Sequence, residues 1–425
     1  MIRVSVLNAS VFTAIAFNSL ARGQDDFPTA TSTPAKGVVP TPKDTIPLDK
    51  LKTLASRQAS AAYASDRVTT PVIPIVVRQE HPDGPRYQEA TSYAFLVHSM
   101  KFASLCRAGD GRLVLVGTGW THDETDGRGI FTAHSDDEGK TWSPPREFHR
   151  GLERPQPISL GGRKLALIPG DDAGFLAFSD DGGETWKDKT PFPKLPDGRV
   201  TYHKGSMLVE DDTVTGLFYC EGERRGGWTA YSLLRRSRDG GRTWKEGIWL
   251  PPEWSTSEGA IARAKDGALV VAMRTAPPDD YPSYSDHWRR ITTARSMDEG
   301  KTWTDHQVHF KYGKTHSDLI VLRDGRLLLT YAARMGELEG HMYHGIEAVV
   351  SRDHGKTWDW DKRFTLFRWA MHQSMHSPCS VELADGRILT VFLYHYHAPW
   401  NKGVLGAKGY PLGITSVVTW SPDPN

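Results

Sequence analysis

The segment Ser296–Trp303, SMDEGKTW, decides the fold, because the chain contains four further versions of it. All five follow the pattern S-x-D-x-G-x-T-W. The other four are SDDEGKTW (135–142), SDDGGETW (179–186), SRDGGRTW (237–244) and SRDHGKTW (351–358). The aspartate can accept hydrogen bonds from its own turn, and the glycine permits a positive φ. Each segment therefore predicts a hairpin turn between two strands, and we expect its aspartate to have a structural role.

A second repeated turn alternates with the first. Apolar runs flank short turns at Asp110-Gly111, Gly161-Gly162, Asp211-Asp212, Asp266-Gly267, Asp324-Gly325 and Asp385-Gly386. The two kinds of turn together define a unit of four strands, and such regular repetition is typical of propellers. Six units predict an all-β protein, a six-bladed β-propeller of four-stranded antiparallel blades. The last unit has no fourth strand after Trp420, so we expect an N-terminal strand, Thr70–Arg78, to close the ring.

Composition and charge exclude several classes of protein. The 425 residues include 52 Lys and Arg against 51 Asp and Glu, so no basic excess indicates a nucleic-acid partner. No apolar run reaches the roughly 18 residues of a membrane span. Residues 1–23 combine an early positive charge with an apolar stretch, which predicts a signal peptide and a secreted or periplasmic protein. Residues 24–66 are rich in Pro, Thr, Ala and Ser and predict a linker, so the propeller would occupy 67–425.

Cysteine and histidine spacing gives no sign of a metal centre. The three cysteines are widely separated and form no CxxC: Cys106, Cys220 and Cys379. We expect buried thiols, with a Cys106–Cys379 pair left open. His395 and His397 have the side chains of zinc ligands, but the spacing supplies no third ligand. The chain also lacks the glycine-rich fingerprints of nucleotide sites. We therefore expect neither a metal nor a cofactor.

The turns also indicate where a functional site would lie. In an up-and-down blade both repeated turns share one face, so the entry into each first strand lies on the opposite face. Counting back about eight residues from the first turn of each blade reaches an ionisable side chain in most blades. These side chains are Lys101, Arg154, His203, Glu258, His316 and His376, with His98 shortly before the first. Convergent ionisable groups at the mouth of a propeller predict a site, although a solvated rim would look similar.

Loops on the same face add candidate residues. An acidic loop in the first blade contains Asp123 and Asp126, and Arg274 and Arg334 end the second strands of the fourth and fifth blades. Arginine and lysine side chains suit a carboxylate ligand, and the candidates are Lys101, Arg154, Arg274 and Arg334. Tyrosine and tryptophan in neighbouring loops would suit a sugar.

The repeated segments resemble the Asp boxes, or BNR repeats, of the sialidase (neuraminidase) superfamily over roughly residues 95–425. The resemblance implies an active site on the face opposite the boxes. It also implies that Glu258 is the active-site glutamate, Arg274 a carboxylate-binding arginine, and Asp126 or Asp123 the acid/base aspartate. The chain departs from the family where His376-Ser377-Pro378 replaces the nucleophilic tyrosine, and Lys101-Phe102-Ala103 replaces an Arg-Ile-Pro element.

Three functions fit these residues. The first is a secreted hydrolase that cleaves the glycosidic bond of a terminal acidic sugar, with Asp126 as the acid and Glu258 as the second carboxyl group. The second is a polysaccharide lyase that acts at a uronic acid by β-elimination, with a histidine base among His98, His203, His316 and His376. The third is a non-catalytic, glycan-binding propeller. In each case the expected partner is a glycan with an acidic sugar.

Overall fold

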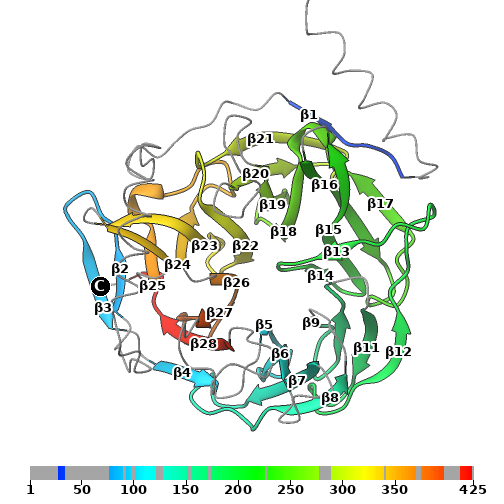
Figure 1. Ribbon diagram of the computed structural model, residues 1–425, viewed down its shortest axis with the longest axis horizontal. Helices are drawn as coiled ribbons and strands as arrows, with labels where there is room; N and C mark the ends of the chain where they lie inside the picture. The colour runs from blue at the N-terminus through cyan, green and yellow to red at the C-terminus, as the bar shows by residue number, and fades with distance from the viewer. Residues whose placement is uncertain are drawn as a thin grey trace, which may run out of the picture.

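A computed structural model gives the structure of the chain, in which six sheets surround a central axis (Figure 1). It describes residues 27–33, 76–89, 92–96, 101–120, 128–150, 155–170, 174–224, 227–276, 289–338, 341–369, 375–396 and 412–423. These residues are almost entirely strand, with short 3-10 turns at Pro252–Trp254 and Trp360–Lys362. The predicted all-β, six-bladed propeller is therefore confirmed.

The first three blades follow one another along the chain. Blade one contains β5 (Lys101–Arg107), β6 (Leu113–Trp120), β7 (Arg128–Ser135) and β8 (Arg146–Arg150). Blade two contains β9 (Gln156–Ser159), β10 (Leu165–Ile168), β11 (Phe175–Ser179) and β12 (Lys187–Pro191). Blade three contains β13 (Tyr202–His203), β14 (Leu208–Glu210), β15 (Thr213–Arg224), β16 (Gly227–Ser237) and β17 (Glu246–Trp249). Its innermost strand is thus divided into β13 and β14, which both pair with β15.

The last three blades also recruit segments from the N-terminal part of the chain. Blade four contains β18 (Thr256–Arg263), β19 (Leu269–Thr275), β20 (Arg290–Ser296) and β21 (Thr302–Val308). Blade five contains β22 (Lys314–Val321), β23 (Leu327–Leu338), β24 (His341–Ser351) and β25 (Phe364–Trp369). Blade six contains β26 (Met375–Glu382), β27 (Ile388–Tyr396), β28 (Leu412–Trp420) and β4 (Ser92–Leu96).

The Asp-box turns have the structure that their sequence predicts. The carboxylate of Asp298 accepts hydrogen bonds from the backbone N–H of Thr302 at 2.8 Å and from its hydroxyl at 2.7 Å. Gly300, with φ of 88°, donates its N–H to the Ser296 hydroxyl at 2.8 Å. The same contacts recur in the other four boxes. Trp303 is fully buried. These turns therefore stabilise the blades.

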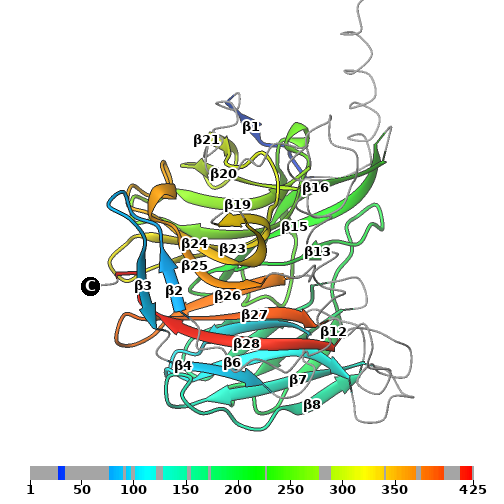
Figure 2. The ribbon, with the colours of Figure 1, turned by 60° about the vertical axis from the view of Figure 1, so that its left-hand side comes forward.

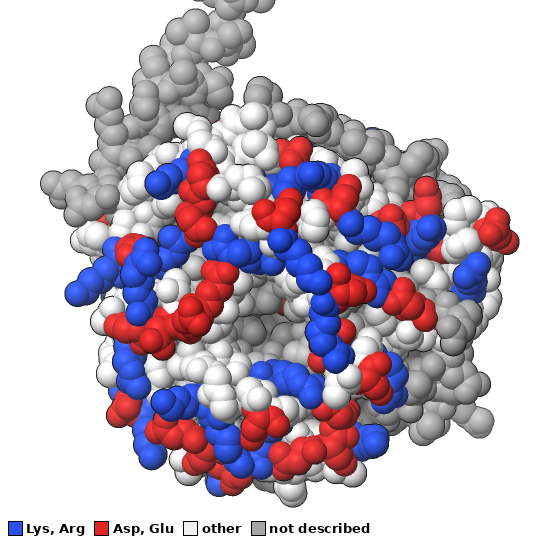
Figure 3. Space-filling model, turned by 180° about the vertical axis from the view of Figure 1, so that it is seen from behind, with Lys and Arg blue, Asp and Glu red and all other residues white. Residues whose placement is uncertain are grey.

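Apolar side chains fill the spaces between neighbouring blades. Val270 and Ala272 of blade four, for example, pack with Leu327 and Leu329 of blade five. Such packing joins each sheet to the next around the ring. Seen from behind, the ring has a hollow at its centre, and basic and acidic side chains are interspersed around it (Figure 3).

An N-terminal strand closes the ring, but it is not the predicted one. β4 pairs antiparallel with β28 and completes blade six (Figures 1 and 2). The predicted segment Thr70–Arg78 contributes instead to β2 (Val76–Gln79), which forms a hairpin with β3 (Arg86–Glu89) and pairs with β25 of blade five. Val77 is fully buried there.

Part of the predicted linker packs on the propeller. β1 (Thr31–Ser32) pairs in parallel with β21, and the N–H of Ala30 donates to the carbonyl of Trp249 at 2.8 Å. Ala30 is buried in a cluster with side chains of blades three and four. Residues 27–33 of the predicted linker thus contact two blades, and of these seven residues only Ala30 is buried. The predicted signal peptide, residues 1–23, and most of the linker lie outside the described residues.

The three cysteines are buried and form no disulfide, so the Cys106–Cys379 pair that the sequence left open does not form. The Sγ of Cys379 contacts the Leu105 carbonyl at 3.2 Å instead. Burial raises the pKa of Cys106 to about 12, so its thiol is unreactive at neutral pH. Within the described part of the chain, no helix is long and apolar enough to cross a membrane.

Candidate active site

The innermost strands of four blades share an irregularity near their starts. The pairing register shifts between Lys101 and Ser104, Thr256 and Gly259, Thr315 and Asp318, and His376 and Cys379. Such bulges turn side chains away from the regular alternation of a strand. His316 and Ser377 also have positive φ values, 53° and 47°, which side chains other than glycine rarely adopt and which cluster at functional sites.

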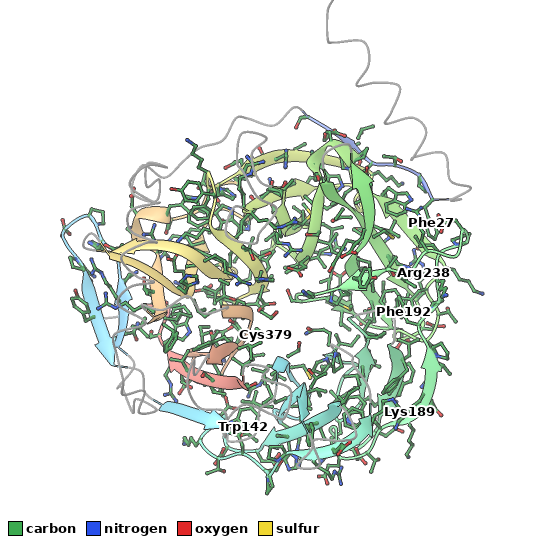
Figure 4. The ribbon with its side chains drawn as sticks, viewed as in Figure 1. Phe27, Trp142, Lys189, Phe192, Arg238 and Cys379 are labelled. Carbon is green, nitrogen blue, oxygen red and sulfur yellow. The ribbon has the colours of Figure 1, made fainter. Side chains whose placement is uncertain are left out.

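These irregular segments surround a cavity of about 30 Å³ on the axis of the ring. All six blades contribute to its lining, which consists of Ser104, Gln156, His203, Lys204, Gly205, Glu258, His316, Ser317, Asp318, Ser377, Pro378 and Cys379. Figure 4 shows Cys379 close to this axis. The structure thus brings together three of the side chains found by counting along the sequence: His203, Glu258 and His316.

Glu258 is the centre of the site, and its side chain is 3% exposed. Its Oε2 lies 3.2 Å from Arg274 Nη1 and 2.7 Å from His316 Nδ1, and its Oε1 pairs with Lys204 Nζ. Burial by itself would raise the pKa of Glu258. Arg274, His316 and Lys204 outweigh that effect and hold the pKa well below its usual value, so the carboxylate is ionised.

The contacts of His316 determine its tautomer. Arg334 Nη2 donates a hydrogen bond to His316 Nε2 at 3.0 Å. Because a guanidinium can only donate, Nε2 must be unprotonated, and the neutral ring carries its proton on Nδ1, facing Glu258. Arg334 therefore occupies the nitrogen that would otherwise serve as a base.

His203 has a structural environment. Its Nδ1 lies 2.7 Å from the carbonyl of Leu217, and its Nε2 lies 2.8 Å from the carbonyl of Gly205. Burial lowers the pKa of His203 to about 4, although both carbonyls favour the protonated ring. Its nitrogens are thus engaged by the backbone, and its ring fixes the turn that carries Lys204.

Arg274 and Arg334 lie behind the lining of the cavity rather than on it. Their residues are 7% and 3% exposed. Arg274 also donates from Nε to the Ser257 hydroxyl at 3.0 Å, so its guanidinium is fixed by two neighbours. In this structure Arg274 holds Glu258, whereas the sequence assigned it to a substrate carboxylate.

Two ionisable residues of the cavity were missed by the sequence analysis. Lys204 directly follows His203, in the gap between β13 and β14, and Asp318 follows His316 by two positions. Counting along the sequence selected one residue in each innermost strand, but a strand with a break or a bulge turns more than one side chain towards the cavity. Lys204 and Asp318 lie within two residues of His203 and His316, and this proximity is the signal that could have identified them.

Several predicted site residues cannot be compared with this geometry. His98, Asp126 and Arg154 lie outside the described residues. Lys101 begins β5 and His376 lies in β26, but only their backbones are described. Within the described residues, no group of three or more His, Cys, Asp or Glu side chains could hold a metal ion.

Comparisons with known proteins agree with this architecture. Residues 164–338 match the family described as "BNR repeat-like domain". A sialidase from Bacteroides fragilis is 26% identical over 280 residues, which cover 58% of this chain and 48% of that protein. The chain therefore spans about half the length of this curated relative.

Solved structures also resemble the chain. A protein of unknown function from Dyadobacter fermentans is 19% identical, with a TM-score of 0.57 over 78% of this chain and 98% of that one. The intramolecular trans-sialidase from Ruminococcus gnavus is 13% identical, with a TM-score of 0.49 over 78% of this chain and 97% of that one. The five Asp boxes, the six-bladed ring and the match over residues 164–338 are features that this chain shares with the BNR-repeat β-propellers of the sialidase superfamily.

Proposed function

We propose that this protein is a glycoside hydrolase that removes a terminal sugar carrying a carboxylate. The observation that carries the proposal is a cluster of positively charged side chains at the cavity. Lys204 lines the cavity and Arg274 lies behind it, both against the carboxylate of Glu258, and Arg334 contacts His316. Arginine and lysine side chains suit a carboxylate ligand.

The named relative supports the same class of substrate. The Bacteroides fragilis protein is called a sialidase, and sialic acid is a sugar with a carboxylate. The family match, over residues 164–338, includes the blade that carries Glu258. An extracellular glycan is the expected source of the sugar, since residues 1–23 have the composition of an export signal.

The proposed mechanism uses two carboxyl groups, as glycoside hydrolysis usually does. Asp126 donates a proton to the leaving oxygen while the glycosidic C–O bond breaks. Glu258 stabilises the positive charge that develops on the sugar, and a water molecule then adds to the anomeric carbon and returns a proton to Asp126. Arg274, Lys204 and His316 keep Glu258 ionised throughout. This assignment avoids the tyrosine nucleophile, whose place is taken by His376-Ser377-Pro378.

The geometry favours hydrolysis over elimination. The lyase alternative needs a histidine base with an available nitrogen close to the sugar. The nitrogens of His203 face two carbonyls, and those of His316 face Arg334 and Glu258. His98 and His376 are the histidines on which the lyase alternative would depend.

Product analysis tests the proposal. The protein and its Glu258→Gln variant would be incubated with sialosides and with uronate-containing glycans, and the products weighed by mass spectrometry. We expect the wild type to release an acidic monosaccharide with the mass gain of one water, and the variant to lose this activity. An unsaturated product that absorbs in the near ultraviolet would establish the lyase, and binding without turnover would establish a glycan-binding protein.

A further inference from the structure

Asp318 lies between two cavities on the axis of the ring. One is the active-site cavity of about 30 Å³, and the other, of about 640 Å³, is lined by residues that follow in the same innermost strands. Asp318, Gln156 and Cys379 line both cavities. Asp318 therefore forms part of the floor of the active site.

The two oxygens of Asp318 have different surroundings. The backbone N–H of Ser380, in blade six, donates a hydrogen bond to Oδ2 at 2.8 Å. Oδ1 has no hydrogen-bond partner among the described residues, although Asp318 is only 1% exposed. A buried oxygen without a hydrogen-bond partner is destabilising, so its presence on a cavity floor calls for a partner from a ligand.

We propose that Asp318 is a specificity-determining residue that recognises the carboxylate of the acidic sugar. In its protonated form Asp318 donates a hydrogen bond from Oδ1 to that carboxylate, and in its ionised form it repels it. The inference rests on the proposed function. The cavity has room for a water molecule or a single carboxylate group but not for a sugar ring, so the ring would lie towards the mouth.

The environment of Asp318 favours the protonated form in mildly acidic solution. Burial raises the pKa of Asp318 to about 6, although the hydrogen bond from the backbone N–H of Ser380 opposes the shift. Since the protonated form binds the anion, affinity should be complete below pH 6 and fall as the pH rises above it.

The neighbouring ionisable groups do not reproduce this behaviour. Titratable and charged groups that share the active-site cavity are His203, Lys204, Glu258, His316 and Cys379. Lys204 and Glu258 form an ion pair, burial lowers the pKa of His203 to about 4, and burial raises that of the Cys379 thiol well above its usual value. His316 is present in both proteins of the comparison below, so it cannot account for a difference between them.

The second cavity adds one thiol and three charged groups. They are Cys106, Arg107, Glu210 and Arg263. Burial raises the pKa of Cys106 to about 12, Arg107 pairs with Glu138, and Arg263 pairs with Glu210. Cys106 therefore stays protonated, and Arg107 and Arg263 stay charged, between pH 5 and 8.

The test measures binding of N-acetylneuraminic acid by calorimetry from pH 5 to pH 8, over which its carboxylate stays ionised. For the wild type we expect Kd to rise about tenfold per pH unit above pH 6. Asp318→Asn carries an amide donor at every pH, so its Kd should stay constant and be about 100-fold lower than that of the wild type at pH 8. Asp180→Asn, a substitution at an exposed turn, should behave like the wild type.

The outcomes separate this inference from the proposed function. The same pH dependence in Asp318→Asn and the wild type would overturn the role of Asp318 alone. Failure of the wild type to bind or cleave any acidic sugar would overturn the proposed function, and this inference with it. If Asp318→Asn does not fold, the wild type can be titrated at pH 7.5 in buffers of different ionisation enthalpy. Uptake of about one proton with the acid and none with its methyl ester supports the proposal, and no uptake with the acid overturns it.

Discussion

Replacing Arg274 by lysine tests whether Arg274 acts on the substrate or through Glu258. In the structure its guanidinium contacts Glu258 at 3.2 Å and the Ser257 hydroxyl at 3.0 Å. A lysine ammonium has no planar fork and can replace only one of these contacts. We therefore expect Arg274→Lys to leave Glu258 less well held and less strongly ionised.

The magnitude follows from the loss of one hydrogen bond to a charged group, which is worth about 1.5–3 kcal/mol. If that energy is lost in the transition state, kcat/KM falls by roughly 10- to 150-fold. The pH dependence should change as well. Because the pKa of Glu258 is lowered in the folded protein, its stabilising effect exists above the unfolded pKa and is lost as the pH falls through the folded one. The variant raises that folded pKa, so the acid limb of the rate profile should move to higher pH.

The assay compares kcat/KM for a sialoside and for its methyl ester, across the acid limb. A residue that acts through Glu258 should cause equal losses on both substrates, whereas one that binds the carboxylate should affect the acid far more. Arg238→Lys is the matched control, because Arg238 pairs with Glu246 on the exposed surface at 2.6 Å (Figure 4). An unmoved acid limb, or a loss confined to the acid, would refute the role that the structure gives to Arg274.

Three further predictions concern stability. Asp298→Ala should lower the free energy of unfolding by about 1–3 kcal/mol, measured by urea denaturation, through the loss of its turn hydrogen bonds, and should leave KM unchanged; a stable but inactive variant would contradict this. A chain that begins after residue 33 should be less stable by roughly 1–3 kcal/mol than one that begins at residue 27. The shorter chain loses the burial of Ala30 and the hydrogen bond from Ala30 to blade three. Equal melting curves would show that the segment does not stabilise the fold. Lys314→Met should lower the free energy of unfolding by about 3–5 kcal/mol, because it removes the ammonium that lies 2.9 Å from the buried carboxylate of Glu347. Combining Lys314→Met with Glu347→Leu should recover most of the loss. A double variant as unstable as the single one would argue against the ion pair as the cause.

The repeated turns could be predicted because their interactions are local. Asp298 bonds to a residue four positions away, and a glycine in the fifth position supplies the positive φ. The alternation of the two turns then determines which strand ends share a face. That is why counting along the sequence could place Glu258, His316 and His203 around one axis.

The remaining details depend on contacts between distant segments. The sequence predicted Thr70–Arg78 as the closing strand, but β4 pairs with β28 instead. Thr70–Arg78 contains two prolines that cannot donate to a strand ladder, and its paired part begins only at Val76. The partners of Glu258 could not be deduced either, because Lys204, Arg274 and His316 come from three different blades.

The bulges explain why more polar and ionisable side chains line this cavity than regular strands could place there. In a straight strand, neighbouring side chains point to opposite faces, so only alternate residues would reach the axis. The register shift between Thr315 and Asp318 allows His316, Ser317 and Asp318 to line one cavity. His316 adopts its positive φ within this bulge, a strain of about 1–3 kcal/mol that its contacts with Glu258 and Arg334 must offset. The strained backbone thus places an ionised glutamate and an aspartic acid with a pKa raised by burial to about 6 at the same cavity, so their protonation states differ in mildly acidic solution.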